Sequence, residues 1–508
     1  MGERPARPRL TRAGGLVTGR STAATPWLAL AAIVLLAAAL RFPTLATQSV
    51  WFDEAATWEL TRLPFGEMLS ALPDRESNPP LYYVLEWLWT RAFGDGAWGL
   101  RSLSAVLGTL VVPVAYGIGH RIGGPRAGLA TAALIAVNPL LVWFSQEARS
   151  YELVVLLSAW SLLLFLRSLD DDRPRVLAWW AAASALALCS HYFAAFVLAP
   201  QVAWLVWRHP RRRAVLAAVG GLAVVGLALL PMLLEQRGNP YDIAGASIVV
   251  RLLQVPKQFL LGYRGPLALA SGLAGAALIA GALWLLARHA RNAVRERAVL
   301  VGGIGAVGVV LPAAAAVLGA DYLNARNVIP SLVPLAAVLG AGFAVTRPPR
   351  IGLALLTALC AISLGVVVVV AADQQYQRPD WKGLARALGS SGEPRVLVVT
   401  PANGEAALRF YRRDLRTLSD AGTRVRDVAV VSVATSSGPG DPPVLQQQYG
   451  AGFPPGLYDF GPPRATRTGA WTTLRFHQPA ATLVQPLPIS SIRFGERPPS
   501  VALLPATR

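Results

Sequence analysis

Apolar runs of about membrane-spanning length recur along this chain as far as residue 371, and they constrain its fold more than any other feature. An α-helix needs ~20 apolar residues to cross ~30 Å of hydrocarbon. Two of the runs, 176–190 and 193–208, are short for a crossing. We predict eleven spans, at residues 22–41, 98–118, 127–145, 152–168, 176–190, 193–208, 214–234, 266–287, 298–319, 328–346 and 351–371. The fold class is therefore predicted to be mainly α, with a polytopic transmembrane helix bundle over residues 22–371.

The composition supports lipid as the solvent for most of the chain. Charged residues make up only 15% and the mean hydropathy is +0.45, whereas soluble proteins carry about 25% charged residues. The net charge of +19 could suggest nucleic acid. However, the basic residues are almost all arginines in short clusters between apolar runs, which fits membrane topology better, so we expect no nucleic-acid partner. Cys189 and Cys360 both fall inside predicted spans, and two cysteines are too few for a cysteine-based zinc site.

Arginine clusters alternate with arginine-poor connections. Cytoplasmic loops collect Arg and Lys, so we expect the cytoplasmic side to hold residues 1–21, 121–126, 167–175, 208–213, 288–297 and 347–350. The Arg-rich start is similar to a signal peptide, but ten further spans favour a retained first helix. The opposite, extracytoplasmic side then receives loops 42–97, 235–265 and 321–327 and the tail 372–508. The preference for Arg over Lys and the many alanines favour a GC-rich bacterial genome, and hence a bacterial plasma membrane.

Two regions outside the spans have a structure of their own. The first outer loop, 42–97, contains the aromatic segment 80–93, which is too short to span and is predicted to lie in the interface. In the tail, 376–388 reads as an amphipathic helix, 395–400 as a buried strand, 405–413 as a second helix and 428–434 as a second strand, with loops at 436–443 and 452–464. The tail 372–508 is therefore predicted to be a small extracytoplasmic α/β domain.

The first outer loop carries two adjacent carboxylates, Asp53 and Glu54. They could bind a cation or a polar substrate, or one could take a proton from a hydroxyl. Alternatively, Asp53 caps a short helix that begins at Glu54. Adjacent carboxylates permit a divalent cation, but no ligand spacing requires one, so we assign no metal ligands.

Other ionisable residues are expected at the same depth. Glu147, Arg149 and Tyr151 follow the third span, and Glu147 and Arg149 could equally pair with each other as interfacial anchors. Arg326 precedes the tenth span against the inside bias of the other arginines, and it could hold a phosphate or act as an anchor. His191 lies in a tight outer turn, where an interfacial histidine is the alternative to a ligand. Together these groups suit a reaction on a lipid-linked phosphate, whose tail stays in hydrocarbon while its head reaches water.

Short motifs follow one another along residues 25–370: L-R-F-P-T-L at 40–45, S-V-W-F-D-E-A at 49–55, N-P-P-L-Y-Y-V-L at 78–85, F-G at 93–94, G-L-R-S-L-S-A-V-L-G at 99–108, N-P-L-L-V-W-F-S-Q-E-A-R-S-Y at 138–151, S-H-Y-F at 190–193 and N-A-R-N-V-I-P at 324–330. Their order resembles the GT-C membrane glycosyltransferases, in the branch of the protein O-mannosyltransferases and lipid A aminoarabinose transferases.

The resemblance implies an enzyme that takes a sugar from a polyprenyl-phosphate donor and passes it, usually with inversion, to an extracytoplasmic acceptor. It implies Asp53 as the catalytic base, with Glu54 beside it. The substrate-binding residues that it implies are Arg41, Pro80, Tyr82, Glu147, Arg149, Tyr151, His191 and Arg326. The family often has Arg-Tyr where this chain has Arg326-Asn327, which is a departure from its pattern. We therefore predict a hexosyl- or pentosyltransferase whose acceptor is a lipid, a glycan or a protein.

Two other functions fit parts of the pattern. A non-enzymatic flippase or transporter of lipid-linked sugars would use the same charges to move a headgroup, and it predicts charges along the span centres, whereas these lie at span ends. A structural protein whose tail binds envelope components predicts that the tail alone retains the function.

Overall fold

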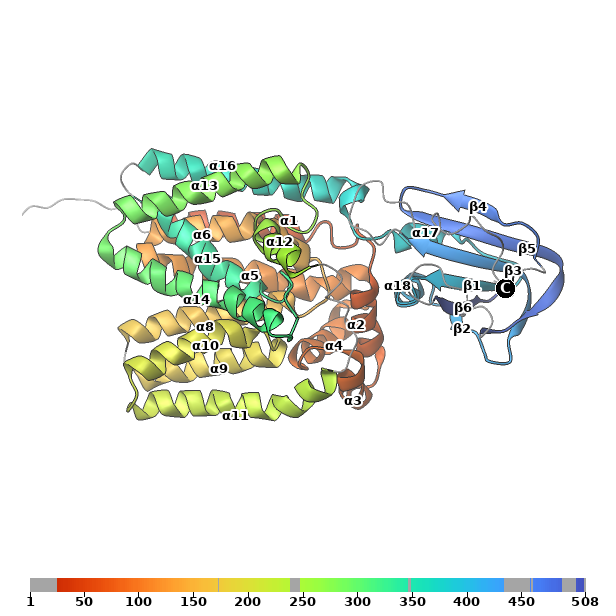
Figure 1. Cartoon of the computed structure of the whole chain (residues 1–508), viewed down its shortest axis with the longest axis horizontal. Coiled ribbons are helices and arrows are strands. Elements are labelled where there is room, and N and C mark those ends of the chain that lie inside the picture. The colour runs from red at the N-terminus through yellow and green to blue at the C-terminus, as the bar shows by residue number, and fades with distance from the viewer. Residues whose placement is uncertain are drawn as a thin grey trace, which may run out of the picture.

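The computed structural model describes residues 25–171, 173–237, 247–345, 349–433, 457, 460–486 and 499–506. Figure 1 shows two parts, a helical bundle and a small α/β domain that lies against one end of it. The predicted fold class, mainly α with a C-terminal α/β domain, is confirmed. The predicted cytoplasmic tail, 1–21, and the predicted loop 436–443 lie outside the described residues.

Each predicted span coincides with helices of the bundle. Within the described residues, six helices are long and apolar enough to cross a membrane, namely α5, α8, α11, α13, α14 and α16, and the bent pair α6–α7 makes a seventh candidate. The remaining predicted spans coincide with α1, α9, α10 and α15, of 12 to 17 residues, so eleven crossings stay a prediction. The bounds are α1 Thr25–Arg41, α5 Ala97–Gly123, α6 Pro125–Val137, α7 Pro139–Ser145, α8 Tyr151–Asp170, α9 Pro174–Ser190, α10 Ala194–Arg208, α11 Arg213–Gln236, α13 Ala268–His289, α14 Asn292–Val317, α15 Leu332–Phe343 and α16 Pro349–Ala372.

The span predicted over 127–145 is not one straight helix. Helices α6 and α7 meet at a bend of 58°. Asn138 lies at the break, and its side-chain oxygen accepts hydrogen bonds from Leu140 N and Leu141 N at 3.0 and 3.1 Å. Pro139 has no N–H to continue the α6 ladder, so the sequence Asn-Pro ends one helix and caps the next. Because of this bend, α7 ends beside the residues that make up the site described below.

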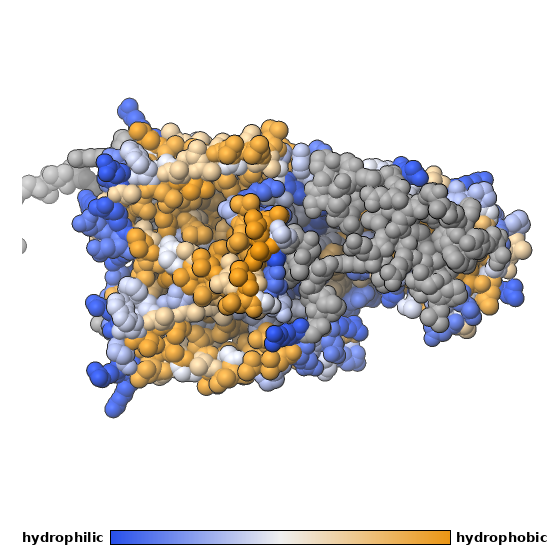
Figure 2. Space-filling view, viewed as in Figure 1, coloured by the Kyte–Doolittle hydropathy of each residue, from blue (hydrophilic) through white to orange (hydrophobic). Residues whose placement is uncertain are grey.

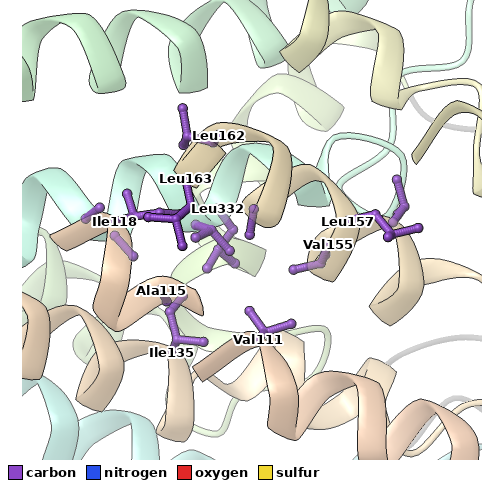
Figure 3. Packing of buried hydrophobic residues seen from close by; sticks show 14 of the residues in the cluster. Val111, Ala115, Ile118, Ile135, Val155, Leu157, Leu162, Leu163 and Leu332 are labelled. Carbon is purple, nitrogen blue, oxygen red and sulfur yellow. The ribbon is translucent and has the colours of Figure 1, made fainter. Parts of the chain in front are cut away.

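Apolar side chains fill the interior of the bundle and also cover its outside. Figure 3 shows Val111, Ile135 and Leu163 among the packed residues of the core. By contrast, α11 is peripheral, and its Val224 and Leu227 are 66% and 67% exposed. Figure 2 shows a broad apolar face over the bundle, with hydrophilic residues at the end away from the α/β domain. Such an exposed apolar belt requires lipid as its solvent, so the chain is a multi-pass membrane protein.

Three of the predicted cytoplasmic loops meet at that hydrophilic end. Arg121 Nη1 and Arg297 Nη2 each lie 2.9 Å from a carboxylate oxygen of Asp170. Arg297 Nη1 also donates to Arg121 O at 2.7 Å. The arginine clusters around these residues therefore share one end of the bundle, and their cytoplasmic orientation stays a prediction.

Helices of the predicted outer loops cover the opposite end. They are α2 Phe52–Arg62, α3 Phe65–Arg75, α4 Leu81–Phe93 and α12 Ile248–Leu261. The predicted interfacial segment 80–93 is the helix α4. In Figure 1, α2 lies between the bundle and the α/β domain, and we refer to this end as the α2 end.

The α/β domain contains more sheet than the two strands predicted. Helix α17 is Trp381–Ala387, shorter than predicted because Asp380 caps it by accepting from Gly383 N at 2.8 Å, and α18 is Gly404–Tyr411. Strand β1 pairs in parallel with β3, while β6 and β5 are antiparallel to β1 and β3 respectively. Within the described residues the sheet order is β2-β6-β1-β3-β5-β4. The strands are β1 Arg395–Thr400, β2 Arg416–Thr417, β3 Thr423–Val433, β4 Arg464–Arg467, β5 Trp471–Val484 and β6 Ser500–Leu504.

Candidate active site

Asp53 lies in the first turn of α2 and faces an arginine from far along the chain. The helix begins at Phe52 with Trp51 at its N-cap, so the alternative that Asp53 caps a helix beginning at Glu54 is wrong. A carboxylate in the first turn is favoured by the helix dipole. Asp53 Oδ2 lies 3.2 Å from Arg326 Nη1, and Asp53 is 8% exposed. No described side chain or backbone N–H donates to its other oxygen, Oδ1, which is therefore available to a substrate.

Arg326 is held by the loop between α14 and α15. Its backbone N–H donates to Asn324 Oδ1 at 3.2 Å, and Tyr263 OH donates to the same oxygen at 3.4 Å. Asn327 Nδ2 donates to Tyr322 O at 2.8 Å. The two asparagines of the N-A-R-N motif thus shape the loop that presents Arg326. This explains the motif in structural terms, including Asn327 at the position where the resembled family often has Tyr.

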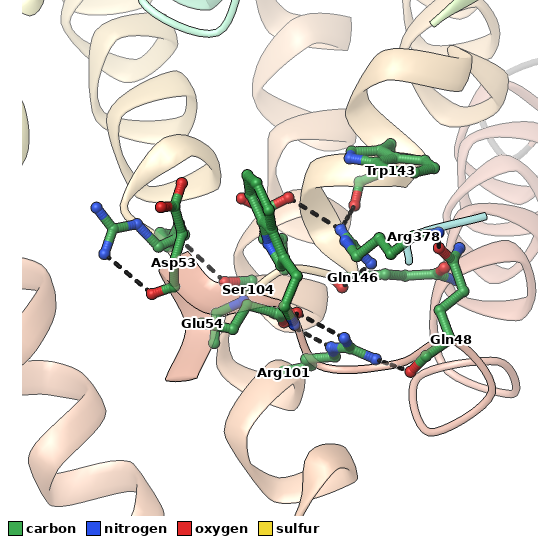
Figure 4. A network of polar contacts seen from close by, with 12 residues as sticks. Gln48, Asp53, Glu54, Arg101, Ser104, Trp143, Gln146 and Arg378 are labelled. Atoms are coloured by element: carbon green, nitrogen blue, oxygen red, sulfur yellow. Dashed lines mark hydrogen bonds and ion pairs between the residues drawn. The ribbon is translucent and has the colours of Figure 1, made fainter. Parts of the chain in front are cut away.

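Glu54 points away from Asp53 into a buried ion pair. Arg101 Nε and Nη2 donate to its two carboxylate oxygens, both at 2.6 Å, and Ala148 N donates to Oε1 at 3.1 Å. Burial raises the pKa of Glu54, but the charge and hydrogen bonds of Arg101 outweigh it, so the net pKa is lowered and Glu54 is ionised. Figure 4 shows Glu54 and Arg101 together. The catalytic role predicted for Glu54 stays a prediction. Its pairing with Arg101 favours a structural role, in which Glu54 holds α2 in place.

Arg149 does not pair with Glu147. Its Nη1 and Nη2 lie 2.6 and 2.8 Å from the two oxygens of Glu76, a residue just after α3 that the sequence did not single out. Arg149 Nη1 also donates to Asp53 O at 3.3 Å and to Thr57 Oγ1 at 3.2 Å. Because the fork grips α2 and the end of α3 together, Arg149 fixes the backbone that carries Asp53.

Glu147 pairs instead with Arg378, which follows α16. Arg378 Nη2 lies 2.9 Å from Glu147 Oε2, and both side chains are buried. Burial, opposed by the charge of Arg378, raises the pKa of Glu147 to about 7. The sequence motifs did not identify Arg378 as a site residue. Its one local signal is its position shortly after the last span, on the side predicted to be poor in arginine.

Tyr151 and His191 lie near Arg326. Tyr151 opens α8, and its ring lies 6.1 Å from that of His191. The N–H of Phe193 donates to His191 Nδ1 at 3.2 Å, which leaves the proton of a neutral ring on Nε2. Burial, together with the charges of Arg149 and Arg326, lowers the pKa of His191 to about 3, so the ring is neutral at physiological pH.

The other predicted binding residues, Arg41, Tyr82 and Pro80, contact the helices around the site. Arg41 is fully buried and donates to Ser145 Oγ at 2.9 Å and to Ala136 O at 2.8 Å, so it joins α1 to the α6–α7 bend. The Tyr82 hydroxyl lies 3.1 Å from Ser104 Oγ. Pro80 is the N-cap of α4. Their predicted substrate contacts stay predictions.

Among the described residues, no group of three or more His, Cys, Asp or Glu side chains could hold a metal ion. Asp53 and Glu54 face different arginines, so the two adjacent carboxylates do not form a joint cation site.

The architecture matches two crystal structures of ArnT from Cupriavidus metallidurans. The apo structure gives a TM-score of 0.57 at 13% sequence identity, and the structure bound to undecaprenyl phosphate gives 0.56 at 12%. Both matches cover 89% of this chain and 98% of ArnT. The chain has the GT-C fold. The resemblance that the sequence motifs suggested is thereby confirmed for the fold.

A match to a family of glycosyltransferases covers part of the chain. A family model described as dolichyl-phosphate-mannose-protein mannosyltransferase matches residues 77–234. This segment includes Tyr82, Glu147, Arg149 and His191, whereas Asp53 and Arg326 lie outside it. A search of curated protein sequences gave no significant match.

Proposed function

We propose that this GT-C protein is a membrane glycosyltransferase that takes a sugar from a polyprenyl-phosphate donor. The single observation that carries the proposal is the meeting of Asp53 and Arg326 at the α2 end, with Nη1 3.2 Å from Oδ2. A carboxylate can take a proton from an acceptor hydroxyl. The neighbouring guanidinium can stabilise the negative charge that develops on a departing phosphate.

The transfer is a single displacement. The acceptor oxygen forms a bond to the anomeric carbon while the bond from that carbon to the phosphate oxygen breaks. Asp53 receives the hydroxyl proton, and polyprenyl phosphate leaves with the electron pair. The other buried carboxylates beside Asp53 are each engaged by an arginine: Glu54 by Arg101, Glu76 by Arg149 and Glu147 by Arg378. Asp53 Oδ1, to which no described group donates, is the oxygen that can take the proton in one direct displacement, so we propose that the reaction inverts the anomeric configuration.

A crevice beside the site has the character that a lipid phosphate needs. Apolar side chains of α1, α7 and α16 line it, including Leu40, Val142 and Val367, and Arg264 is also among the lining residues. An isoprenoid chain requires an apolar wall, and its phosphate requires a cation. ArnT of the same fold was crystallised with undecaprenyl phosphate, which supports a lipid of this class as the donor here.

The placement of charge favours transfer over transport. The buried ion pairs of Glu54, Glu76 and Glu147 all lie at the α2 end, whereas a translocation path requires polar groups through the bundle. We propose that the α2 end is extracytoplasmic because the arginine clusters occupy the other end. The C-terminal domain then lies outside a bacterial plasma membrane, and the acceptor is a lipid, glycan or protein on that side.

A reconstitution experiment separates the two functions. The purified protein is placed in liposomes with undecaprenyl phosphate carrying radiolabelled mannose, glucose or arabinose, and membrane extract is added as the source of acceptor. We expect release of undecaprenyl phosphate and an inverted glycosidic product from one of these donors. Movement of intact donor between leaflets without cleavage of any donor would support the transporter instead.

A further inference from the structure

The C-terminal domain shares a hydrophobic core with the start of the catalytic loop. Val50 and Trp58, on either side of Asp53 in sequence, pack in one buried cluster with Trp381 of α17 and Phe410 of α18. The rings of Trp58 and Phe410 meet edge to face, with centroids 5.3 Å apart. Figure 1 shows α17 and α18 on the side of the domain that faces α2. The domain is therefore packed against the helix that carries the proposed base.

Hydrogen bonds fix the backbone immediately before α2. Val50 N donates to the hydroxyl of Tyr411 at 2.7 Å. Ser49 Oγ donates to Asp380 Oδ1 at 3.2 Å and accepts from Lys382 N at 3.0 Å. Since Asp53 follows this segment by three residues, the domain sets the position from which the carboxylate is presented.

Arg378 reaches from the domain's first residues into the site itself. It is 3% exposed, and its guanidinium lies 4.5 Å from the Trp143 ring centroid. Besides Glu147, it donates to Gln146 O at 3.2 Å and to Trp143 O at 3.4 Å, as Figure 4 shows. The contacts fix the turn between α7 and α8, on which Glu147 lies.

Charge explains why Glu147 needs this arginine. The charged groups that act on Glu147 are Asp53 and Glu54 of α2, Arg101 of α5, Arg326 of the loop before α15 and Arg378, with the phenols of Tyr151 and Tyr263 nearby. Arg101 and Arg326 are already paired with Glu54 and Asp53. Arg378 is therefore the counter-ion of Glu147, and without it a buried carboxylate next to two others takes up a proton.

We propose that the C-terminal domain is a positioning part of the active site, in which Arg378 favours the carboxylate form of Glu147 and the α17–α18 contacts hold the backbone that presents Asp53. The proposal rests on the proposed transfer activity. It assigns a role to the domain that the tail as an independent binding module would not have.

The first test is the pH profile of donor cleavage by Arg378→Ala, Arg378→Lys and Glu147→Gln. Loss of the cation raises the pKa of Glu147 above about 7, so below pH 7 Arg378→Ala should lose up to about 10-fold in activity relative to the wild type for each unit of rise, and it should recover at higher pH. Arg378→Lys or added guanidinium should restore part of the loss. In Glu147→Gln, removing Arg378 should cost little more. An equal loss at every pH, without rescue, would overturn the assignment of Arg378.

A second test does not depend on activity. Hydrogen–deuterium exchange of residues 49–62 is compared in the wild type, Arg378→Ala, Tyr411→Phe and the control Arg426→Ala, whose half-exposed pair with Glu393 lies away from α2. We expect faster exchange of this segment in Arg378→Ala and Tyr411→Phe than in the wild type, and no change in Arg426→Ala. If the wild type cleaves no donor, the proposed function fails, and this exchange still decides the docking role. Unchanged exchange in Tyr411→Phe and Arg378→Ala would overturn it.

Discussion

Asp53 and Arg326 are 273 positions apart in the chain, yet Arg326 Nη1 lies 3.2 Å from Asp53 Oδ2. The first residue comes from the first helix of a long loop, and the second comes from the turn before α15. Neither is held by this contact alone: Arg149 grips the backbone of Asp53, and Asn324 holds the N–H of Arg326. The pairing is thus a product of the surrounding packing, which is what preorganised catalytic groups require.

Arg326→Ala should lower the rate of sugar transfer more than it weakens donor binding. The guanidinium meets the phosphate most strongly as negative charge develops, so we expect kcat to fall about 100-fold or more with a smaller change in KM. Arg326→Lys keeps the positive charge but not the two-pronged donor geometry of the guanidinium, so its kcat should lie between those of the wild type and Arg326→Ala. A change confined to KM would show that Arg326 binds the donor without stabilising the transition state.

Arg101→Ala should strongly destabilise the protein. It leaves Glu54 without its counter-ion at 0% exposure, and breaking such a pair costs about 3–5 kcal/mol. The melting temperature in detergent measures the effect. The matched control is Arg426→Ala, since an exposed pair contributes about 0–1 kcal/mol. Equal melting temperatures for the two variants would contradict the structural role given to the Glu54–Arg101 pair.

Stability should fall as the pH falls below about 6.5, and His191 should contribute to the fall. Its pKa in the folded protein is lowered to about 3, chiefly by burial, whereas in an unfolded chain it is near 6.5. Between these values the unfolded state binds a proton that the folded state does not, so acid favours unfolding. His191→Gln should flatten the dependence of melting temperature on pH from 7 to 4. An unaltered slope would mean that the imidazole is protonated in the folded protein.

Gly108→Ala should destabilise the bundle near the α7–α8 turn. A Cβ at this position would lie 2.1 Å from Ser145 Oγ and 2.9 Å from Glu152 Oε2, on side chains that are fully buried. Overpacking of this kind costs about 1–3 kcal/mol. Gly303→Ala on α14 is the control, because a Cβ there meets nothing within 4 Å and alanine favours a helix. Thermal unfolding of both variants in the same detergent checks the difference.

Local sequence patterns predicted most of the fold because spans and strands depend on the apolar pattern of consecutive residues. The buried strand at 395–400 was predicted from its short apolar run, and the segment 80–93, predicted to lie in the interface from its length and its aromatic residues, is the helix α4. The bend at Asn138-Pro139 was overlooked because hydropathy alone joined 127–145 into one run. Strands β2, β4, β5 and β6 were missed. β2 and β4 are short and exposed, β6 has only five residues, and the buried face of β5 includes the polar residues Thr472 and Gln478, so its apolar alternation is short.

The site was predictable in its members but not in its pairings. Asp53, Arg149, Glu147 and Arg326 stand out because ionisable residues are costly near a bilayer. Their partners do not stand out: Glu76, Arg101 and Arg378 lie between 47 and 231 positions from the groups that they bind. No local pattern specifies such contacts, so only the folded chain shows that Glu147 belongs to Arg378 and Arg149 to Glu76.

The most direct test of the central claim is sugar transfer from undecaprenyl-phosphate donors by Asp53→Asn, measured in membranes that contain equal amounts of each variant. Asp74→Asn is the matched control, because Asp74 is an exposed carboxylate on α3 of the same loop. We expect Asp53→Asn to transfer at least ~100-fold more slowly than the wild type while still binding donor, and Asp74→Asn to be unaffected. Transfer at the wild-type rate by Asp53→Asn would contradict the account.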